Sequence, residues 1–166
     1  MSESLSRPQA IQKIAEMIKD VRIAMLSTVT PQGTIHSRPM ATQESEFEGE
    51  LLFLTRQESS KIDEIAHGSQ VTLNYVDSKD HRFVTLTGHA TLSKDRATIH
   101  RLWNPLYKAW FPNGEDDPEI TVIRVNVDQA EYWEAPANSV VRGYQLLKAA
   151  VTKGESRVGE HQAVTL

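Results

Sequence analysis

Short apolar runs rich in strand-forming residues recur along most of this chain, and turns rather than helices join most of them. Strands that follow one another through short turns pair antiparallel, whereas a parallel sheet needs a long crossover after each strand. The spacing therefore predicts a mainly β protein in which six to seven antiparallel strands form a small barrel with peripheral helices. The expected strands are residues 22–30, 35–43, 51–55, 70–76, 82–92, 120–127 and 130–135.

Helical spacing of apolar residues appears beside and between these runs. Residues 6–20 begin with Ser6 as a candidate cap and Pro8 in the first turn, and their apolar positions fall on one face. A glycine inside the long fifth run, Gly88, indicates a bulge or bend of the kind small barrels need. The other expected helices are residues 59–68, 93–103 and a short aromatic one within 104–119.

The chain of 166 residues is long enough for one domain with a real core. We expect this domain to span residues 1–153, with a terminal helix over 138–154 that Gly143 weakens. Residues 154–166 hold few large apolar side chains, so we expect a flexible C-terminal tail that contributes little to the core.

Composition excludes several classes of function. The net charge of -4 argues against a general nucleic-acid binder, so any anion site must be local. Without cysteine there is no disulfide, no thiolate chemistry and no Cys-ligated zinc, which fits a cytoplasmic protein. No apolar run approaches the roughly 18 residues of a membrane span, and we expect no membrane partner. The six histidines are scattered without metal-ligand spacing, so we expect no metal site.

One local cation follows the third expected strand. Ser60 and Lys61 stand at the start of an expected helix, close behind Thr55. Hydroxyls, a lysine and the free N–H groups of a helix N-terminus are all good phosphate ligands. The alternative is that Ser60 only caps the helix and Lys61 is a solvated surface residue, since such caps are common. The segment alone leaves both interpretations open.

A second local cation, Arg38, precedes a proline inside the second expected strand. An arginine is suited to a bidentate clamp on an anion. It is equally suited to pair with Glu44 or Glu46 at the edge of a sheet. Both interpretations remain open from the residues alone.

Several motifs, in order, resemble the general-stress-protein branch of the pyridoxamine 5′-phosphate oxidase-like FMN-binding split barrels. The resemblance covers roughly residues 6–135, and each motif is weak alone but fairly specific in this order and spacing. It implies a split β-barrel that binds FMN between the two chains of a homodimer. The main motifs are RPM at 38–40, T-x4-SK at 55–61, LWNPLYKAWFPNGEDDPEI at 102–120 and AEYWE at 130–134.

The resemblance also implies roles for single residues. Arg38, Ser60 and Lys61 would hold the FMN phosphate, while Pro39 and Met40 lie along the isoalloxazine edge. Leu54 and Thr55 would contribute backbone and a hydroxyl, and Trp133 would approach the flavin from the partner chain. The implied cofactor-binding set is thus Arg38, Pro39, Met40, Leu54, Thr55, Ser60, Lys61 and Trp133.

The chain departs from the pattern of vitamin B6 oxidases in that family. Gln43 stands where those enzymes carry a lysine for the substrate phosphate. Neither Arg96 nor Arg101 has the serine four residues later that completes their second phosphate site. We therefore expect no vitamin B6 oxidase activity.

The leading expectation is an FMN-dependent oxidoreductase that uses a small-molecule electron donor or acceptor, with no catalytic acid or base assigned. Alternatives are a non-catalytic flavin carrier or stress-linked flavin-binding protein, the same barrel with a deazaflavin or haem, and a small barrel that binds a protein partner. Trp103, Trp110 and Phe111 are more typical of a core or dimer interface than of a ligand contact.

Overall fold

The computed structural model describes residues 5–43, 46–135 and 160–166. Helices and strands lie close to the positions that the sequence predicts, and within the described residues no helix is long and apolar enough to cross a membrane. The elements are α1 (Arg7–Ile18), β1 (Ile23–Val29), β2 (Ile35–Ala41), β3 (Glu50–Arg56), α2 (Ser60–His67), β4 (Gln70–Asp77), β5 (Arg82–Ser93), α3 (Arg96–Leu102), the short 3-10 helix η1 (Pro105–Ala109), β6 (Ile120–Glu134) and β7 (Glu160–Thr165).

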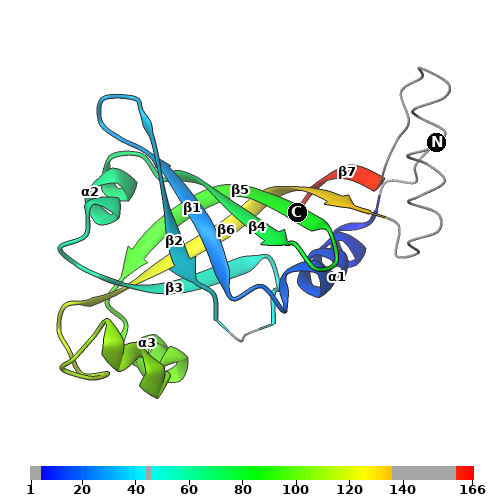
Figure 1. The fold of residues 1–166 in the computed structure, drawn as a ribbon. Helices are drawn as coiled ribbons and strands as arrows, with labels where there is room; N and C mark the ends of the chain where they lie inside the picture. Colours follow the sequence, from blue (N-terminus) through cyan, green and yellow to red (C-terminus); the bar gives the residue numbers. More distant parts are fainter. Residues whose placement is uncertain (1–4, 44–45, 136–159) are drawn as a thin grey trace, which may run out of the picture.

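All seven strands belong to one antiparallel sheet, which runs in the order β2-β1-β4-β5-β6-β3 (Figure 1). β3 and β7 both pair with β6, β3 with its first half and β7 with its second. The sheet curls around a core to which α1 and α2 also contribute, while α3 and η1 cover the outer face near β3. This is the mainly β split-barrel architecture that the strand spacing and the resemblance predict.

Residue alternation explains which faces are buried. In β4 and β5 every second residue is buried, as expected for strands with one face on the core. The first half of β6 is apolar on both faces because it lies between the barrel core and a second cluster under α3. That second cluster contains Leu52, Ile99, Leu102, Phe111, Ile120 and Val122.

Gly88 lies at a shift in the register between β5 and β6, which confirms the expected bulge. A Cβ at this position would lie 2.0 Å from the backbone oxygen of Asn126. Only glycine allows the two strands to approach this closely.

Two expectations about the end of the chain are wrong. Residues 120–127 and 130–135 are not separate strands, because β6 runs unbroken from Ile120 to Glu134 along β5. The tail is not loose at residues 160–166, because β7 pairs with β6 and the side chain of Val164 is buried. The expected helix at 138–154 and the start of the tail lie outside the described residues.

Candidate functional site

A cavity of about 360 Å³ lies between β2 and β3, the two strands at the ends of the sheet path. The second strand, the third strand, the start of α2 and η1 all contribute to its wall. Of the eight residues that the sequence predicts for the site, the structure places five in this wall: Pro39, Met40, Leu54, Thr55 and Lys61.

The polar end of the cavity is formed where β3 leads into α2. Thr55 is the buried penultimate residue of β3, and its hydroxyl lies 3.0 Å from the Nζ of Lys61 and 3.2 Å from the hydroxyl of Ser59. Ser59 is the N-cap residue of α2, yet its side chain makes no capping hydrogen bond. Three polar side chains therefore converge beside the free N–H groups of a helix N-terminus, where an anion is stabilised.

Lys61 is not the solvated surface residue of the alternative interpretation. It is half-buried in the cavity wall. Burial and the nearby charge of Arg38 lower the pKa of its ammonium group, and only Glu64 opposes them. A negatively charged ligand at this end would relieve the repulsion between the two cations.

Arg38 does not line the cavity, although its charge acts on Lys61 in the cavity wall. Its Nη1 donates a 2.5 Å hydrogen bond to the hydroxyl of Thr28, and its Nη2 contacts the carboxylate of Glu64 on α2. The ion pair is buried, since 13% of the Arg38 side chain and 7% of the Glu64 side chain are exposed. Arg38 thus has an acidic partner in Glu64, which the sequence did not suggest; of the two glutamates considered from the sequence, Glu46 is exposed and Glu44 lies outside the described residues.

Glu64 is held in its charged form. Its burial alone would raise the pKa, but hydrogen bonds from His36, Thr28 and Arg38, together with the Arg38 charge, lower the pKa from 4.5 to about 2. His36 Nδ1 lies 2.9 Å from Glu64 Oε1, and Thr28 donates to Oε2 at 2.5 Å. The polar end therefore combines two cations with one buried anion.

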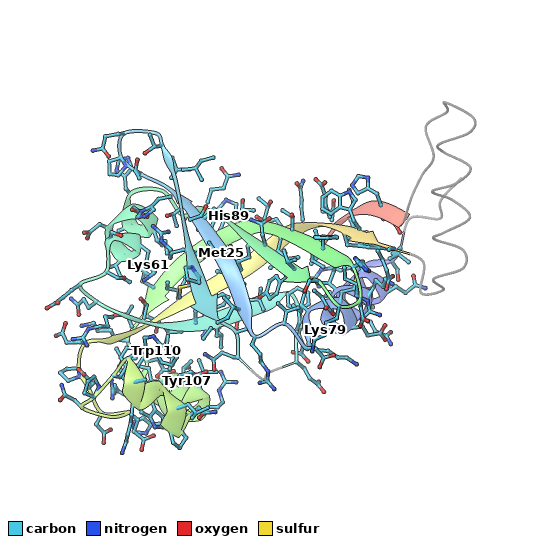
Figure 2. All side chains as sticks on the ribbon, in the orientation of Figure 1. Met25, Lys61, Lys79, His89, Tyr107 and Trp110 are labelled. Atoms are coloured by element: carbon cyan, nitrogen blue, oxygen red, sulfur yellow. The ribbon has the colours of Figure 1, made fainter. Side chains whose placement is uncertain are left out.

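The opposite end of the cavity is apolar and aromatic. Ile23, Pro39, Met40 and Leu54 lie on the strand side, and Tyr107, Trp110 and Phe111 face them from η1 and the residues after it. The Trp110 side chain is 60% exposed, and its ring lies 6.4 Å from that of Tyr107 (Figure 2). A wide apolar slot with an exposed aromatic rim can hold a flat ring system.

The cavity wall also contains Gln43, whose Oε1 accepts a 3.1 Å hydrogen bond from the hydroxyl of Tyr107. This contact joins the end of β2 to η1 across the cavity. None of the described residues that line the cavity carries a carboxylate or an imidazole. The lining therefore offers hydrogen bonds, the ammonium group of Lys61 and the guanidinium of Arg56, but neither the imidazole nor the carboxylate that most often serves as a general acid or base.

Ser60 and Trp133 do not line the cavity. Ser60 is exposed, and its neighbour Ser59 takes the place expected for it. Trp133 lies near the far end of β6, eleven residues (133 − 122) beyond Val122, the register partner of Leu54. At about 3.3 Å per strand residue, this separates it from the cavity by about 35 Å along the strand. Its ring stacks on His161 of β7 with centroids 4.7 Å apart.

The eight predicted residues leave out Ser59, Glu64, Tyr107 and Trp110, although the sequence offered the Ser59 hydroxyl beside that of Ser60 as a phosphate ligand and placed Trp110 in a core or interface. A sequence signal existed for two of them. Ser59 precedes Lys61 by two residues, and Glu64 follows it by three, which places both on the first turns of the same helix. Trp110 and Tyr107 carried no such signal, because an aromatic residue at helical spacing is usually buried in a core.

A larger cavity, of about 560 Å³, lies between α1 and the residues that follow β2. It contains none of the eight predicted residues, and its lining mixes acidic and basic side chains without a common orientation of charge. In the part of the chain that the structure describes, no three His, Asp or Glu side chains gather as metal ligands would. The cavity between β2 and β3 is therefore the better candidate site.

Comparisons with known proteins agree with this fold. A family described as pyridoxamine 5′-phosphate oxidase like matches residues 9–157. The protein bli-3 of Neurospora crassa is 26% identical over 167 aligned residues, which cover 95% of this chain and 80% of that protein.

Two solved structures show the same architecture. A candidate general stress protein 26 from Jannaschia sp. superimposes with a TM-score of 0.75 at 22% identity, covering 96% of this chain and 99% of that chain. A structure from Xanthomonas citri, described as a general stress FMN/FAD binding protein, gives a TM-score of 0.67 at 27% identity and covers 76% of this chain and 89% of that chain.

Proposed function

The chain belongs to the pyridoxamine 5′-phosphate oxidase-like family, and from that premise we propose that it binds FMN in the cavity between β2 and β3. The phosphate would lie at the polar end, against Thr55, Ser59, Lys61 and the N-terminus of α2, with Arg38 behind it. The ring would lie at the apolar end. The relative from Xanthomonas citri, described as FMN/FAD binding, supports the choice of ligand.

The observation that carries the proposal is the division of one cavity into two chemically different ends. Arg38 and Lys61 lie close enough for the charge of Arg38 to lower the pKa of Lys61, and Lys61 lies in the first turn of α2, beside its free N–H groups. This donor set fits a phosphate monoester, which carries about two negative charges at neutral pH. The aromatic and aliphatic walls fit a flat ring but offer little to a second charged group.

The same lining argues against a vitamin B6 oxidase. Gln43 bonds to Tyr107 and brings no positive charge. Arg96 donates to the backbone oxygens of Glu115 and Asp117, so its guanidinium fixes the loop after η1. Gln43 and Arg96 therefore provide no second binding site for a substrate that carries its own phosphate group.

We propose that the site is completed by a second copy of the chain. The outer face of the sheet carries a group of exposed apolar side chains, which a dimer interface would cover: Ile23, Met25, Val29, Ile35, Val76 and Phe83. β1 contributes three of them, at alternate positions. Trp133 of the second copy would then meet the flavin that Trp133 of the same chain cannot reach.

The flavin would supply the redox chemistry, exchanging electrons with a small-molecule donor or acceptor. The residues of this chain would bind it, orient it and exclude water from one face. A non-catalytic flavin carrier is the second candidate, and the lack of a carboxylate or imidazole among the described lining residues favours it. Steady-state oxidation of NADH or NADPH by the FMN-loaded protein separates the two: turnover supports the oxidoreductase, and its absence with other donors as well supports the carrier.

Titrations of FMN and riboflavin test the binding site. Removing a charge-assisted hydrogen bond typically costs about 1.5–3 kcal/mol, or roughly ten- to a hundredfold in affinity. Arg38→Ala should weaken FMN binding by this amount and Lys61→Ala by less, because a guanidinium can bind two oxygens. Riboflavin lacks the phosphate and should lose much less. Lys79→Ala, which removes a lysine in the turn after β4, is the matched control (Figure 2). Equal losses for both flavins, or no loss of FMN affinity in folded Arg38→Ala, would reject the phosphate site.

A further inference from the structure

The most unusual feature of the polar end is a carboxylate buried beside the cations of an expected anion site. Glu64 has 5% of its surface exposed and lies on α2, one helical turn after Lys61. Its charge opposes that of a phosphate, so its presence needs a physical reason. The reason lies in the contacts that it makes with β1 and β2.

Glu64 reaches a face where β1 and β2 present matched side chains. Thr28 lies directly opposite His36 in the strand register, and Arg38 follows two residues later on the same face. Glu64 Oε2 accepts from Thr28 and contacts Arg38 Nη2, while Oε1 lies 2.9 Å from His36 Nδ1. Three elements are thereby joined through one carboxylate.

These contacts fix the guanidinium of Arg38 from behind. Nη1 is held by Thr28 and Nη2 by Glu64. A guanidinium has five N–H donors. Among the described residues none accepts a hydrogen bond from Nε, so donors remain for a ligand while the group is already oriented.

We propose that Glu64 is a positioning residue for the phosphate group of the ligand: it holds Arg38 in place through a buried ion pair, so that the guanidinium bridges Glu64 and the phosphate. This inference rests on the proposed FMN site. α2 carries both Lys61 and Glu64. One helix therefore places the lysine that would contact the phosphate and the glutamate that would orient Arg38. A flexible arginine loses rotational freedom about several side-chain bonds when it binds a ligand, whereas a pre-oriented arginine has already lost that freedom.

Glu64→Gln is the direct test, because it keeps the size and one acceptor oxygen of the side chain but removes its charge. We expect this variant to bind FMN about tenfold more weakly and riboflavin about as well as the wild type. Asp63→Asn, which removes an exposed carboxylate from the same turn of α2, is the matched control and should leave both affinities unchanged. A gain in FMN affinity in Glu64→Gln would show that Glu64 only repels the phosphate, and equal losses for the two flavins would show a merely structural role. Either result overturns the inference.

A double-mutant cycle shows whether Glu64 acts through Arg38. In the Arg38→Ala background, Glu64→Gln should no longer lower FMN affinity, because there is no guanidinium left to orient. The same loss in both backgrounds would contradict the proposal. Thr28→Val supplies a second variant should Glu64→Gln fold poorly, and we expect from it a smaller loss, about threefold, that is again confined to FMN.

A measurement without ligand separates this inference from the proposed function. In the nuclear magnetic resonance spectrum of the ligand-free wild type, the Nη2–H signal of Arg38 that contacts Glu64 should be resolved and protected from exchange with water. It should broaden or disappear in Glu64→Gln but not in Asp63→Asn. An unchanged Arg38 signal in Glu64→Gln would overturn the positioning role even if FMN did not bind. Failure of the wild type to prefer FMN over riboflavin would instead overturn the phosphate site.

Discussion

The two ends of β6 differ in their surroundings: one adjoins the candidate cavity, and the other carries an exposed tryptophan. At the first end, β3, α2 and η1 gather around a cavity whose polar and apolar parts come from one chain. At the second end, Trp133 stacks on His161 of β7 and remains 38% exposed. The first end carries the donor set that we propose for a phosphate, and the second presents an exposed aromatic side chain.

This difference bears on the dimer that we propose. Trp133 lies about 35 Å along β6 from the cavity of its own chain, and in the proposed dimer it would serve the site of the other copy. The exposed apolar face of β1, β2, β4 and β5 is the surface through which such a copy would dock. The two ends of β6 can therefore be tested separately.

The largest effect is expected from a charge placed on that apolar face. Met25→Lys puts an ammonium group on the outer side of β1, and an unpaired charge buried in an interface costs about 3–5 kcal/mol. We expect light scattering to show a monomer and both flavins to bind more weakly. Gln12→Lys adds the same charge on exposed α1 and should leave the dimer intact. A wild-type protein that is a monomer with flavin bound would contradict the proposed dimer.

Acid should distinguish the two ends through their buried carboxylates. The pKa of Glu64 is lowered from 4.5 to about 2, so its contribution to stability is present above pH 4.5 and is lost as the pH falls toward 2. The size is on the order of 3 kcal/mol. Denaturant unfolding of wild type and Glu64→Gln between pH 6 and pH 2.5 should show that this part of the acid sensitivity is absent from the variant.

Glu134, at the second end, supplies the matched variant for this experiment. Its burial raises the pKa, but Lys13 and Arg82 outweigh that effect and lower it. Because 21% of its side chain is exposed, solvent weakens the pair, and Glu134→Gln should remove less of the acid sensitivity than Glu64→Gln. Equal effects of the two variants would show that the ends do not differ in this respect.

Removing β7 should affect stability at the second end without changing the phosphate site. A chain that stops at residue 159 loses the pairing with β6 and the buried side chain of Val164. Burying a valine contributes about 1.5–3 kcal/mol, so we expect a loss near 2 kcal/mol in the free energy of unfolding. The ratio of FMN to riboflavin affinity should stay as in the full chain. A changed ratio would mean that β7 influences the first end.

The smallest effect should come from Trp133→Leu. In a dimer the indole would contact the ring of the flavin rather than its phosphate, so FMN and riboflavin should lose affinity alike, by about threefold or less than 1 kcal/mol. Fluorescence titration of both flavins into the wild type and the variant measures this loss. A loss confined to FMN would place Trp133 near the phosphate and would contradict the comparison.

The fold could be predicted largely from local patterns, because each strand of this barrel is a short apolar run bounded by turn residues. The error at 120–135 has a physical cause: Asp128 and Gln129 look like a turn in the sequence, but both are exposed outward from a strand that continues along β5. The error at 160–165 arises because β7 is short and polar on one side, and its stability comes from the edge of β6 rather than from its own residues.

The site could be predicted only where the residues are close in the sequence. Thr55 and Lys61 lie six positions apart around the start of one helix, and the structure places them in contact. The partner of Arg38 could not be predicted, because Glu64 reaches it only after α2 docks against β1 and β2. The exposed ring of Trp110 depends in the same way on how η1 packs near β3, which no local pattern reports.

The shared edge of β6 also determines how the molecule can open without unfolding. β5 pairs with β6 over its length, whereas β3 and β7 divide the other edge between them. Fraying of β7 therefore frees backbone amides on one edge of the second half only, while β5 still protects the other edge and β3 stays in place. In hydrogen-exchange terms, β6 spans two cooperative units of unequal stability, and the less stable one can open many times while the cavity at the other end of the strand remains closed.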